Sequence, residues 1–335
     1  MITLICGILI FCLMIFPHEL GHFLTAKACG VKVNEFSMGM GPALYKKQKG
    51  ETLYSLRAVP IGGYCAMEGE DEDSEDPRAF DNKANWQKAI ILAAGSVMNF
   101  LVALIIIIGL TFYTGVATTT LEVVSEDSPA MEAGLEAGDV ITAVNGEKTD
   151  SWAEVTGIIG GAEAGDTLTL TVDRNGEQKT LTSKVGKSED GRSVIGVECH
   201  VSHNFFACLA GGFKSTGRMI ATLGQALRQI FTGQVGMDQL GGPVAIVKVA
   251  GDAGKNGIAT FLYLAAFISI NLGVFNLLPF PALDGGRLVF LVIRKITGKR
   301  VTKSAEAKVH FIGIVLLLAL MVYVTWNDIS RLFTG

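Results

Sequence analysis

The sequence predicts a polytopic α-helical membrane protein with four transmembrane helices, a membrane-associated β-hairpin region and one soluble, mainly β domain. Of the 335 residues, 49% are hydrophobic and only 18% are charged, and the mean hydropathy of +0.41 is too high for an ordinary soluble protein. Four stretches are long and apolar enough to cross a bilayer, which takes roughly 20 residues. Between the second and third stretches the composition becomes polar, with alternating strands and Gly-rich turns.

These stretches divide the chain into four regions. We expect membrane spans at about 2–26, 89–115, 259–283 and 309–326. The regions are an N-terminal membrane half (1–115), the soluble domain (116–201), a surface amphipathic helix with a loop (202–257) and a C-terminal membrane half (258–335). No Lys or Arg precedes the first apolar stretch and positive charge follows it, so we expect this span to be retained rather than cleaved as a signal peptide.

Charge and cysteine usage narrow the function classes. A net charge of −4 without a clustered basic face gives no indication of nucleic-acid binding. The six cysteines have no paired spacing, so we expect free thiols. Cys199, His200, His203 and Cys208 leave a second metal site as a minor alternative, because their spacing matches no familiar zinc module.

The inner end of the first span carries a metal-binding pattern. His18 and His22 are four residues apart, so on a helix their imidazoles project from one face and can share one Zn²⁺. Glu19 lies beside them and can take a proton from a metal-held water, as the His-Glu-x-x-His pattern implies. No charged residue occurs in 1–17, and ionisable groups are costly in lipid, so the pattern indicates a functional site. The alternative is a helix end whose polar residues reach the headgroups.

A catalytic zinc site usually has a third protein ligand and an open position for water. Asp284 is the only charged residue between Lys255 and Arg287, and it lies at the end of the third apolar stretch. A carboxylate there needs a cation or hydrogen bonds to offset its desolvation. Asp284 is therefore the candidate third ligand, and a turn or helix N-cap before Gly285 is the alternative.

The two motifs together resemble those of a known protein family. His18-Glu19-Leu20-Gly21-His22 early in the chain and Leu283-Asp284-Gly285 late in it resemble the site-2 protease family of intramembrane zinc metalloproteases, in its bacterial branch of the RseP and RasP type. The likeness covers nearly the whole chain. It implies Zn²⁺ bound by His18, His22 and Asp284, catalysis by Glu19, and substrate held near the metal by Asn276.

Residues 31–64 are expected to form two strands and a turn. In the family, similar Gly-x-Gly and Pro-x-Gly-Gly-Tyr motifs flank a hairpin that dips toward the membrane. A helical substrate exposes no scissile backbone, so it must unwind, and an open strand edge can pair with the freed chain. The alternative is a hairpin that only caps the helices. The next segment, Glu68 to Asp76, has seven acidic residues in nine and no evident partner, so we expect a solvated loop rather than a metal site.

Two further segments resemble the family. Gly95-Ser96-Val97-Met98-Asn99 is similar to its Gly-Pro-x-x-Asn element, with Ser96 where Pro is usual, which puts a helix break there in doubt. Ser128-Pro129-Ala130, Ala133-Gly134-Leu135 and Gly138-Asp139-Val140-Ile141 resemble a bacterial PDZ domain, and Asp173-Arg174-Asn175-Gly176 predicts a hairpin turn. Because PDZ grooves bind extended peptides, this domain either docks a substrate segment or excludes substrates with bulky outer domains; family analogy favours exclusion.

Loop charges predict the orientation. The segment between the third and fourth spans has one acid, Glu306, against seven basic residues, and such a short basic segment is expected on the cytoplasmic side. The basic residues are Arg287, Arg294, Lys295, Lys299, Arg300, Lys303 and Lys308. Four crossings then place the PDZ domain and both termini outside a bacterial plasma membrane, with both halves of the zinc site at the cytoplasmic end of their helices.

The predicted function is zinc-dependent hydrolysis of peptide bonds in or near transmembrane segments of single-pass membrane proteins within the lipid bilayer. The resemblance implies substrates such as a pre-trimmed anti-sigma factor or remnant signal peptides. A catalytically inactive, membrane-anchored PDZ scaffold is the alternative, but it gives no reason for four polar residues at one depth. A small transporter is weaker, because the chain has no internal repeat.

Overall fold

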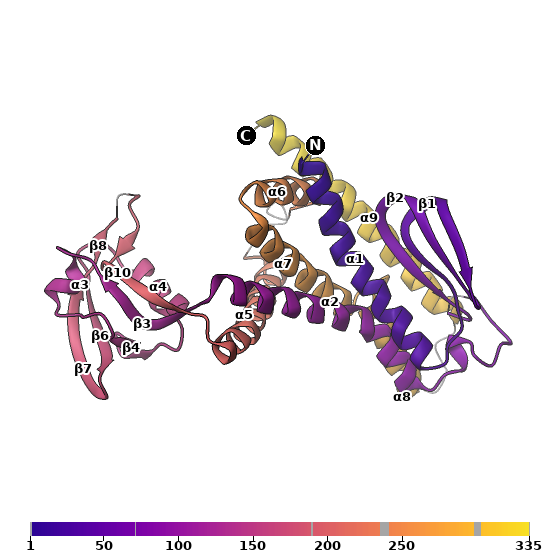
Figure 1. Ribbon diagram of the computed structural model, residues 1–335. Coiled ribbons are helices and arrows are strands. Elements are labelled where there is room, and N and C mark those ends of the chain that lie inside the picture. Colours follow the sequence, from indigo (N-terminus) through magenta and orange to yellow (C-terminus); the bar gives the residue numbers. More distant parts are fainter. Residues whose placement is uncertain (1, 71, 189, 235–240, 298–302, 335) are drawn as a thin grey trace. The chain divides into compact units, whose positions relative to one another are not determined.

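The computed structural model describes residues 2–70, 72–188, 190–234, 241–297 and 303–334, and the chain forms two compact units (Figure 1). The membrane unit contains Met1–Leu110 and Phe213–Gly335, and the soluble unit contains Thr111–Gly212. Each unit has its own hydrophobic cores.

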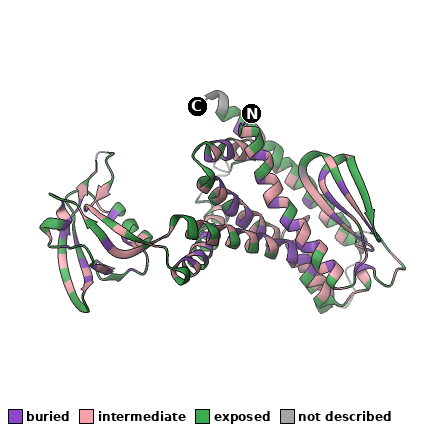
Figure 2. Ribbon diagram, in the orientation of Figure 1, coloured by how far each residue is buried: buried purple, intermediate pink, exposed green. Residues whose placement is uncertain are grey.

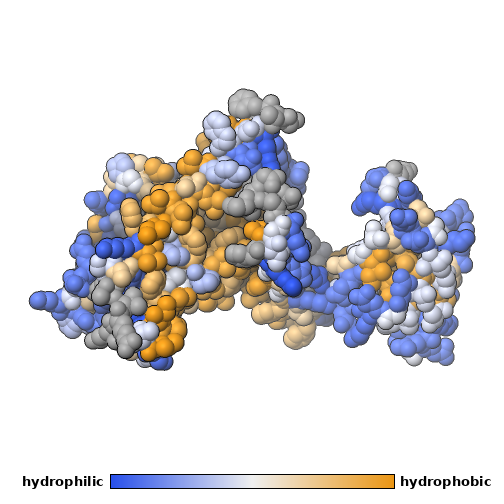
Figure 3. Space-filling model, turned by 180° about the vertical axis from the view of Figure 1, so that it is seen from behind, coloured by the Kyte–Doolittle hydropathy of each residue, from blue (hydrophilic) through white to orange (hydrophobic). Residues whose placement is uncertain are grey.

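Four helices are long and apolar enough to span a membrane, as the sequence predicts. They are α1 (Ile2–Ala28), α2 (Asn85–Thr114), α7 (Ile258–Leu277) and α9 (Lys303–Thr334). The other long helices are α5 (Phe205–Phe231), α6 (Pro243–Lys255) and α8 (Asp284–Thr297), and a 3-10 turn, η1, covers Phe80–Asn82. Hydrophobic residues gather over the surface of the membrane unit (Figure 3), which suits contact with lipid.

One face of α1 organises the membrane unit. Its buried residues recur every three or four positions, so they share a helix face that packs against α6, α7 and β2 (Figure 2). They are Gly7, Ile10, Met14, Pro17, His18, Gly21, His22 and Ala26. Gly21 allows a close approach of α2, because a Cβ there would lie 2.3 Å from the Ala94 carbonyl oxygen. The two histidines therefore face the interior.

The third span is shorter than the predicted 259–283, because α7 ends at Leu277. Two prolines, Pro279 and Pro281, follow, and proline disfavours helical backbone both at itself and at the residue before it. The loop folds back so tightly that a Cβ on Gly285 would lie 2.2 Å from the Leu278 carbonyl oxygen. Asp284 then begins α8.

The basic segment predicted as a loop is mostly helical. The helix α8 covers its first half, with Arg294 and Lys295 in the last turn, and α9 begins at Lys303. The sequence pattern did not reveal α8 because its apolar residues are too few for a span and its charges are interspersed among them. Lys299 and Arg300 lie outside the described residues.

The predicted hairpin has more pairing than two simple strands. The strands β1 (Val33–Lys49) and β2 (Thr52–Met67) are both bent, so the first part of β1 pairs with both ends of β2. Phe36, for example, lies opposite Cys65 on one side and Tyr54 on the other. The bends fall at Gly39, Gly41 and Gly62, whose positive φ angles favour glycine. Among the described residues, no strand pairs with the other edge of the end segment 63–67.

The soluble unit is an antiparallel sheet of the order β10-β3-β4-β6-β7, with a helix beside it (Figure 1). The sheet contains β3 (Val116–Val124), β4 (Val140–Val144), β6 (Thr167–Arg174), β7 (Glu177–Lys184) and β10 (Val197–Ser202), with β5 (Glu147–Lys148) paired to β4. A separate two-stranded sheet consists of β8 (Gly186–Lys187) and β9 (Ser193–Val194), and the helices of the unit are α3 (Pro129–Glu132) and α4 (Trp152–Gly161). Leu121, Ile141, Val155 and Leu170 belong to its core.

The predicted turn of this unit joins β6 to β7. Asn175 and Gly176 have φ angles of +54° and +87°, as expected for a two-residue turn of type I′. Just before it, Arg174 donates from Nε to Oδ1 and from a terminal nitrogen to Oδ2 of the buried Asp139, both at 2.7 Å. This two-point ion pair links the start of β4 to the end of β6.

Replacing Arg174 with Met is expected to destabilise the soluble unit, because the Asp139 carboxylate would remain buried without its cation. Burial alone would raise the pKa of Asp139, but the hydrogen bonds from Arg174 and from the Glu136 amide, together with the charges of Arg174 and Lys179, outweigh it and lower the pKa. The stabilisation is therefore present above the pKa of the unfolded carboxyl, about 4, and is lost as the pH falls through the folded pKa. Hydrogen exchange of the β4 and β6 amides at several pH values tests this. An R174M protein with an unchanged acid response would contradict it.

Candidate metal centre and catalytic site

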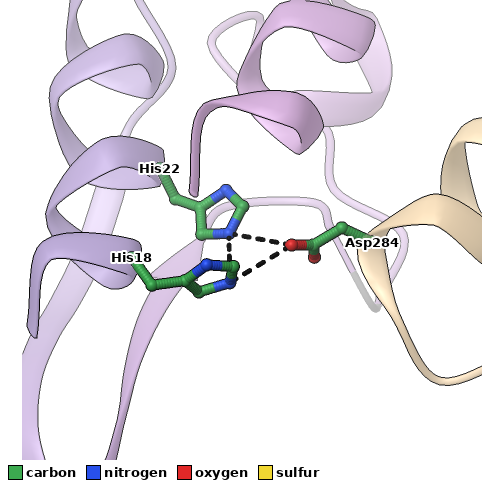
Figure 4. A group of neighbouring side chains, drawn as sticks. All are labelled: His18, His22 and Asp284. Atoms are coloured by element: carbon green, nitrogen blue, oxygen red, sulfur yellow. Dashed lines mark hydrogen bonds and ion pairs between the residues drawn. The ribbon is translucent and has the colours of Figure 1, made fainter. Parts of the chain in front are cut away.

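Three electron-rich atoms converge in the membrane unit. The Nε2 atoms of His18 and His22 are 3.2 Å apart, and Asp284 Oδ2 lies 3.2 Å from the first and 3.3 Å from the second (Figure 4). Both histidine side chains are only 9% exposed and the aspartate 20%. In tetrahedral zinc sites with bonds of about 2.0 to 2.2 Å, neighbouring ligand atoms lie about 3.4 Å apart. The three atoms thus have the spacing that a shared zinc ion needs.

Hydrogen bonding supports the same assignment. His22 Nδ1 lies 2.8 Å from the carbonyl oxygen of Ile91, which only accepts, so Nδ1 carries the proton and Nε2 keeps its lone pair. Asp284 Oδ2 is buried and has no hydrogen-bond donor among the described residues. A lone pair and a carboxylate oxygen that face each other repel unless a cation lies between them. The donor set therefore fits Zn²⁺.

Gly95 brings α2 against these ligands. A Cβ at this position would lie 2.4 Å from His22 Nε2 and 2.6 Å from His18 Cε1. The helix runs unbroken from Asn85 to Thr114, so Ser96 in the place of the usual proline goes with a continuous helix. Beside it, the side-chain polar atoms of Ser96 and Asn99 are buried without a hydrogen-bond partner in the described part of the chain. Water near these groups would satisfy them.

The structure also brings Glu19 and Asn276 to this region. Glu19 lies beside β2, since a Cβ added to Gly63 would lie 3.3 Å from Glu19 Cγ. Asn276, in the last turn of α7, has its Nδ2 3.3 Å from His18 Nε2. Glu19, both histidines and Asp284 line one cavity of about 620 Å³. All five residues singled out by the sequence therefore lie in one neighbourhood.

The acidic segment from Glu68 to Asp76 forms ion pairs with other parts of the chain, so it is not a freely solvated loop. Lys32 Nζ lies 3.1 Å from Glu68 and 3.7 Å from Asp76, and Arg287 of α8 pairs with Glu70. Hydrogen bonds from Ser74, Asn34 and Lys32 lower the pKa of Glu68 to about 2. The expectation was wrong on partners because the cations come from Lys32, just before β1, and from Arg287 in α8, which are distant in sequence. Asp71 lies outside the described residues.

This segment instead lines the cavity of the metal centre, with Glu68, Glu70, Glu72 and Asp73 among the lining residues. The minor alternative of a second metal site finds no support. In the described ranges, the only group of three or more residues with metal-ligand geometry is His18, His22 and Asp284.

Sequence reasoning missed three contributors to the site. The Ile91 carbonyl has no sequence signal, because any residue supplies one. No sequence signal showed that Gly95 lies next to the ligands either, since small residues are common in membrane helices. His310, whose Nδ1 accepts from the Ala282 amide 2.9 Å away, could have been found as an ionisable residue at the start of an apolar span.

Two histidines and an aspartate around a shared point, with a second carboxylate beside them inside a helical membrane unit, define a metal-dependent hydrolase of the membrane. The model of peptidase family M50 matches residues 6–320, and the chain belongs to this family, the site-2 proteases.

Known relatives match this sequence over nearly the whole length of both chains. The chain is 33% identical to the zinc metalloprotease RasP of Shouchella clausii, over 99% of this chain and 100% of the relative. It is 32% identical to the regulator of sigma-W protease RasP of Bacillus subtilis, over 99% of both chains, and 31% identical to the zinc metalloprotease RasP of Geobacillus kaustophilus, over 99% of this chain and 98% of the relative. Among solved structures, the PDZ domain of an SdrC-like protein from Listeria innocua is 27% identical, with a TM-score of 0.24, and covers 26% of this chain and 99% of its own.

The protein is therefore an intramembrane zinc metalloprotease with four membrane helices and a PDZ domain, and Zn²⁺ is its cofactor. This sets aside the inactive scaffold and the transporter.

Replacing Gly95 with Ala is expected to lower zinc affinity by about tenfold or more, because the added methyl would overlap the His22 and His18 rings. Gly109→Ala is the matched control on the same helix, since no atom lies within 4 Å of where its Cβ would sit. Zinc per molecule, measured on purified protein with unchanged helical content, tests this. Equal zinc affinity in the two variants would show that Gly95 is not needed next to the ligands.

Proposed function

We propose that His18, His22 and Asp284 bind the zinc ion, that Glu19 is the catalytic base, and that Asn276 positions the substrate, in an enzyme that cleaves transmembrane segments of single-pass membrane proteins. The observation that carries this proposal is the mutual spacing of 3.2 to 3.3 Å between the three ligand atoms, with Glu19 lining the same cavity.

The roles follow from chemistry and position. Zinc, when bound, polarises the scissile carbonyl and lowers the pKa of a bound water. Glu19 takes the proton of the attacking water and passes it to the leaving amine, a role that needs a carboxylate within reach of both. The Asn276 amide, next to His18, can donate to the substrate backbone beside the reacting carbonyl.

The β2 edge is suited to hold an unwound substrate. The segment 63–67 pairs with β1 on one side, and no described strand pairs with its other edge. An added Cβ on Gly63 would lie 3.3 Å from Glu19 Cγ, so this strand passes close to the catalytic carboxylate. A substrate segment added to this edge would be extended, as cleavage requires, and its backbone would lie at the metal centre.

The substrate class follows from access and from the PDZ domain. We propose that the enzyme lies in a bacterial plasma membrane, with its active site facing the cytoplasm and its PDZ domain outside. The basic residues of α8 and early α9 support this orientation, and the polar cavity supplies water. Exclusion of substrates with intact outer domains by the PDZ domain fits substrates already trimmed by another protease. A pre-trimmed anti-sigma factor suits the sigma-W regulator name of the Bacillus subtilis relative, and remnant signal peptides fit equally well.

Glu19→Gln is expected to lower cleavage of a model transmembrane peptide by at least about 100-fold while zinc content stays unchanged, because Gln cannot accept the proton. Asp284→Asn is expected to lower zinc content as well, because a neutral amide replaces an anionic ligand. Detergent-purified protein assayed for cleavage and metal, with and without a chelator, separates the two effects. Persistent turnover by E19Q would remove Glu19 from its role.

N-methylation of substrate backbone amides is expected to reduce cleavage by roughly five- to tenfold at alternate positions flanking the scissile bond, because each lost hydrogen bond to β2 weakens binding by about 1 kcal/mol. A series of singly N-methylated peptides, compared by kcat/KM, gives the pattern. The absence of alternation would contradict strand addition at β2.

A further inference from the structure

The loop that carries Asp284 is held by α9. His310 Nδ1 accepts the backbone N–H of Ala282, two residues before Asp284, at 2.9 Å. One turn further along α9, Gly313 lies so close to the loop that an added Cβ would be 2.4 Å from the Pro281 carbonyl oxygen. Most residues around them on α9 are exposed, so this contact is a localised one.

The backbone at Ala282 needs such a contact. Its φ angle is +80°, in the left-handed region that a residue with a Cβ rarely adopts. Conformations of this kind persist only where the surroundings impose them. The hydrogen bond from the Ala282 amide to His310 is a side-chain contact of that kind, and it acts directly on the strained residue.

The surroundings of His310 suit an acceptor at Nδ1. Its other nitrogen, Nε2, lies 3.8 Å from the Glu306 carboxylate, and its ring lies 5.5 Å from the Phe290 ring of α8. A proton on Nε2 faces the carboxylate and leaves the Nδ1 lone pair for the Ala282 amide. The ring is 14% exposed, so water competes little for this bond.

We propose that His310 is a positioning residue for the third zinc ligand: by accepting the Ala282 amide it fixes the loop conformation that aims the Asp284 carboxylate at His18 and His22. The inference rests on the proposed role of Asp284. It assigns to α9, which supplies none of the proposed ligands, a direct part in zinc affinity, much as partners of metal ligands have in other sites.

His310→Gln and His310→Asn in the full-length purified protein form the test. The Asn Oδ1 lies close to where Nδ1 was and can accept the Ala282 amide, whereas the Gln oxygen lies near the Nε2 position. Both variants lose the ring and its contact with Phe290. We expect H310Q to lower zinc affinity by about 10- to 100-fold and to reduce kcat more than it changes KM, and H310N to restore most of both. Phe311→Leu, at an exposed neighbouring position, is the neutral control.

Ala282→Gly supplies a second measurement, because glycine adopts a φ of +80° without strain. In the A282G background, H310Q should cost much less zinc affinity than in the wild type. Equal losses in H310N and H310Q, or a loss in H310Q that A282G leaves unchanged, would overturn the inference. Since zinc affinity is measured apart from cleavage, the expected affinity pattern in a protein that cleaves no membrane peptide would support the positioning role and contradict the proposed substrate class.

Discussion

The mutual repulsion of three electron-rich atoms, and the cation that relieves it, is the constraint around which the membrane unit is arranged. The His18 and His22 lone pairs and the Asp284 carboxylate meet within 3.3 Å, and both histidine side chains are only 9% exposed. Without a positive charge this arrangement would be costly in an apolar environment. With zinc, the same desolvation strengthens the attraction between the ion and its ligands.

Close backbone approach is what makes this meeting possible. Gly21 and Gly95 let α1 and α2 touch beside the ligands, and Gly285 and Gly286 let the chain reverse between α7 and α8. Larger residues at these positions would separate the elements by more than a zinc bond allows. The centre therefore depends on the absence of side chains as much as on the ligands themselves.

The surroundings of the centre divide the remaining tasks. β2 passes close to Glu19, the acidic segment and Arg287 of α8 line the cavity, and α9 contacts the loop before Asp284. Each of these elements comes from a different part of the chain. The centre is therefore assembled from segments that only the folded chain brings together.

Much of the architecture can be predicted from the sequence, because a segment that crosses lipid must be long and apolar. Apolar length predicts four spans, and the i, i+4 spacing of His18 and His22 predicts a shared face. Local chemistry likewise predicts the Asn175-Gly176 turn. The limits of α7 were misjudged because hydropathy continues past Leu277 although Pro279 ends the helix. The partners of Glu68 and Asp76 were missed because Lys32 reaches them only when the start of β1 pairs with the end of β2.

By itself, the sequence determined the fold class and the residue types of the candidate centre, since these depend on composition and on short-range spacing. Only the tertiary structure decided that Asp284 reaches both histidines, that Ile91 sets the tautomer of His22, and that His310 accepts a hydrogen bond from the Ala282 amide. Those contacts join residues tens to hundreds of positions apart. No local pattern encodes them, because they arise from helix packing and loop closure in three dimensions.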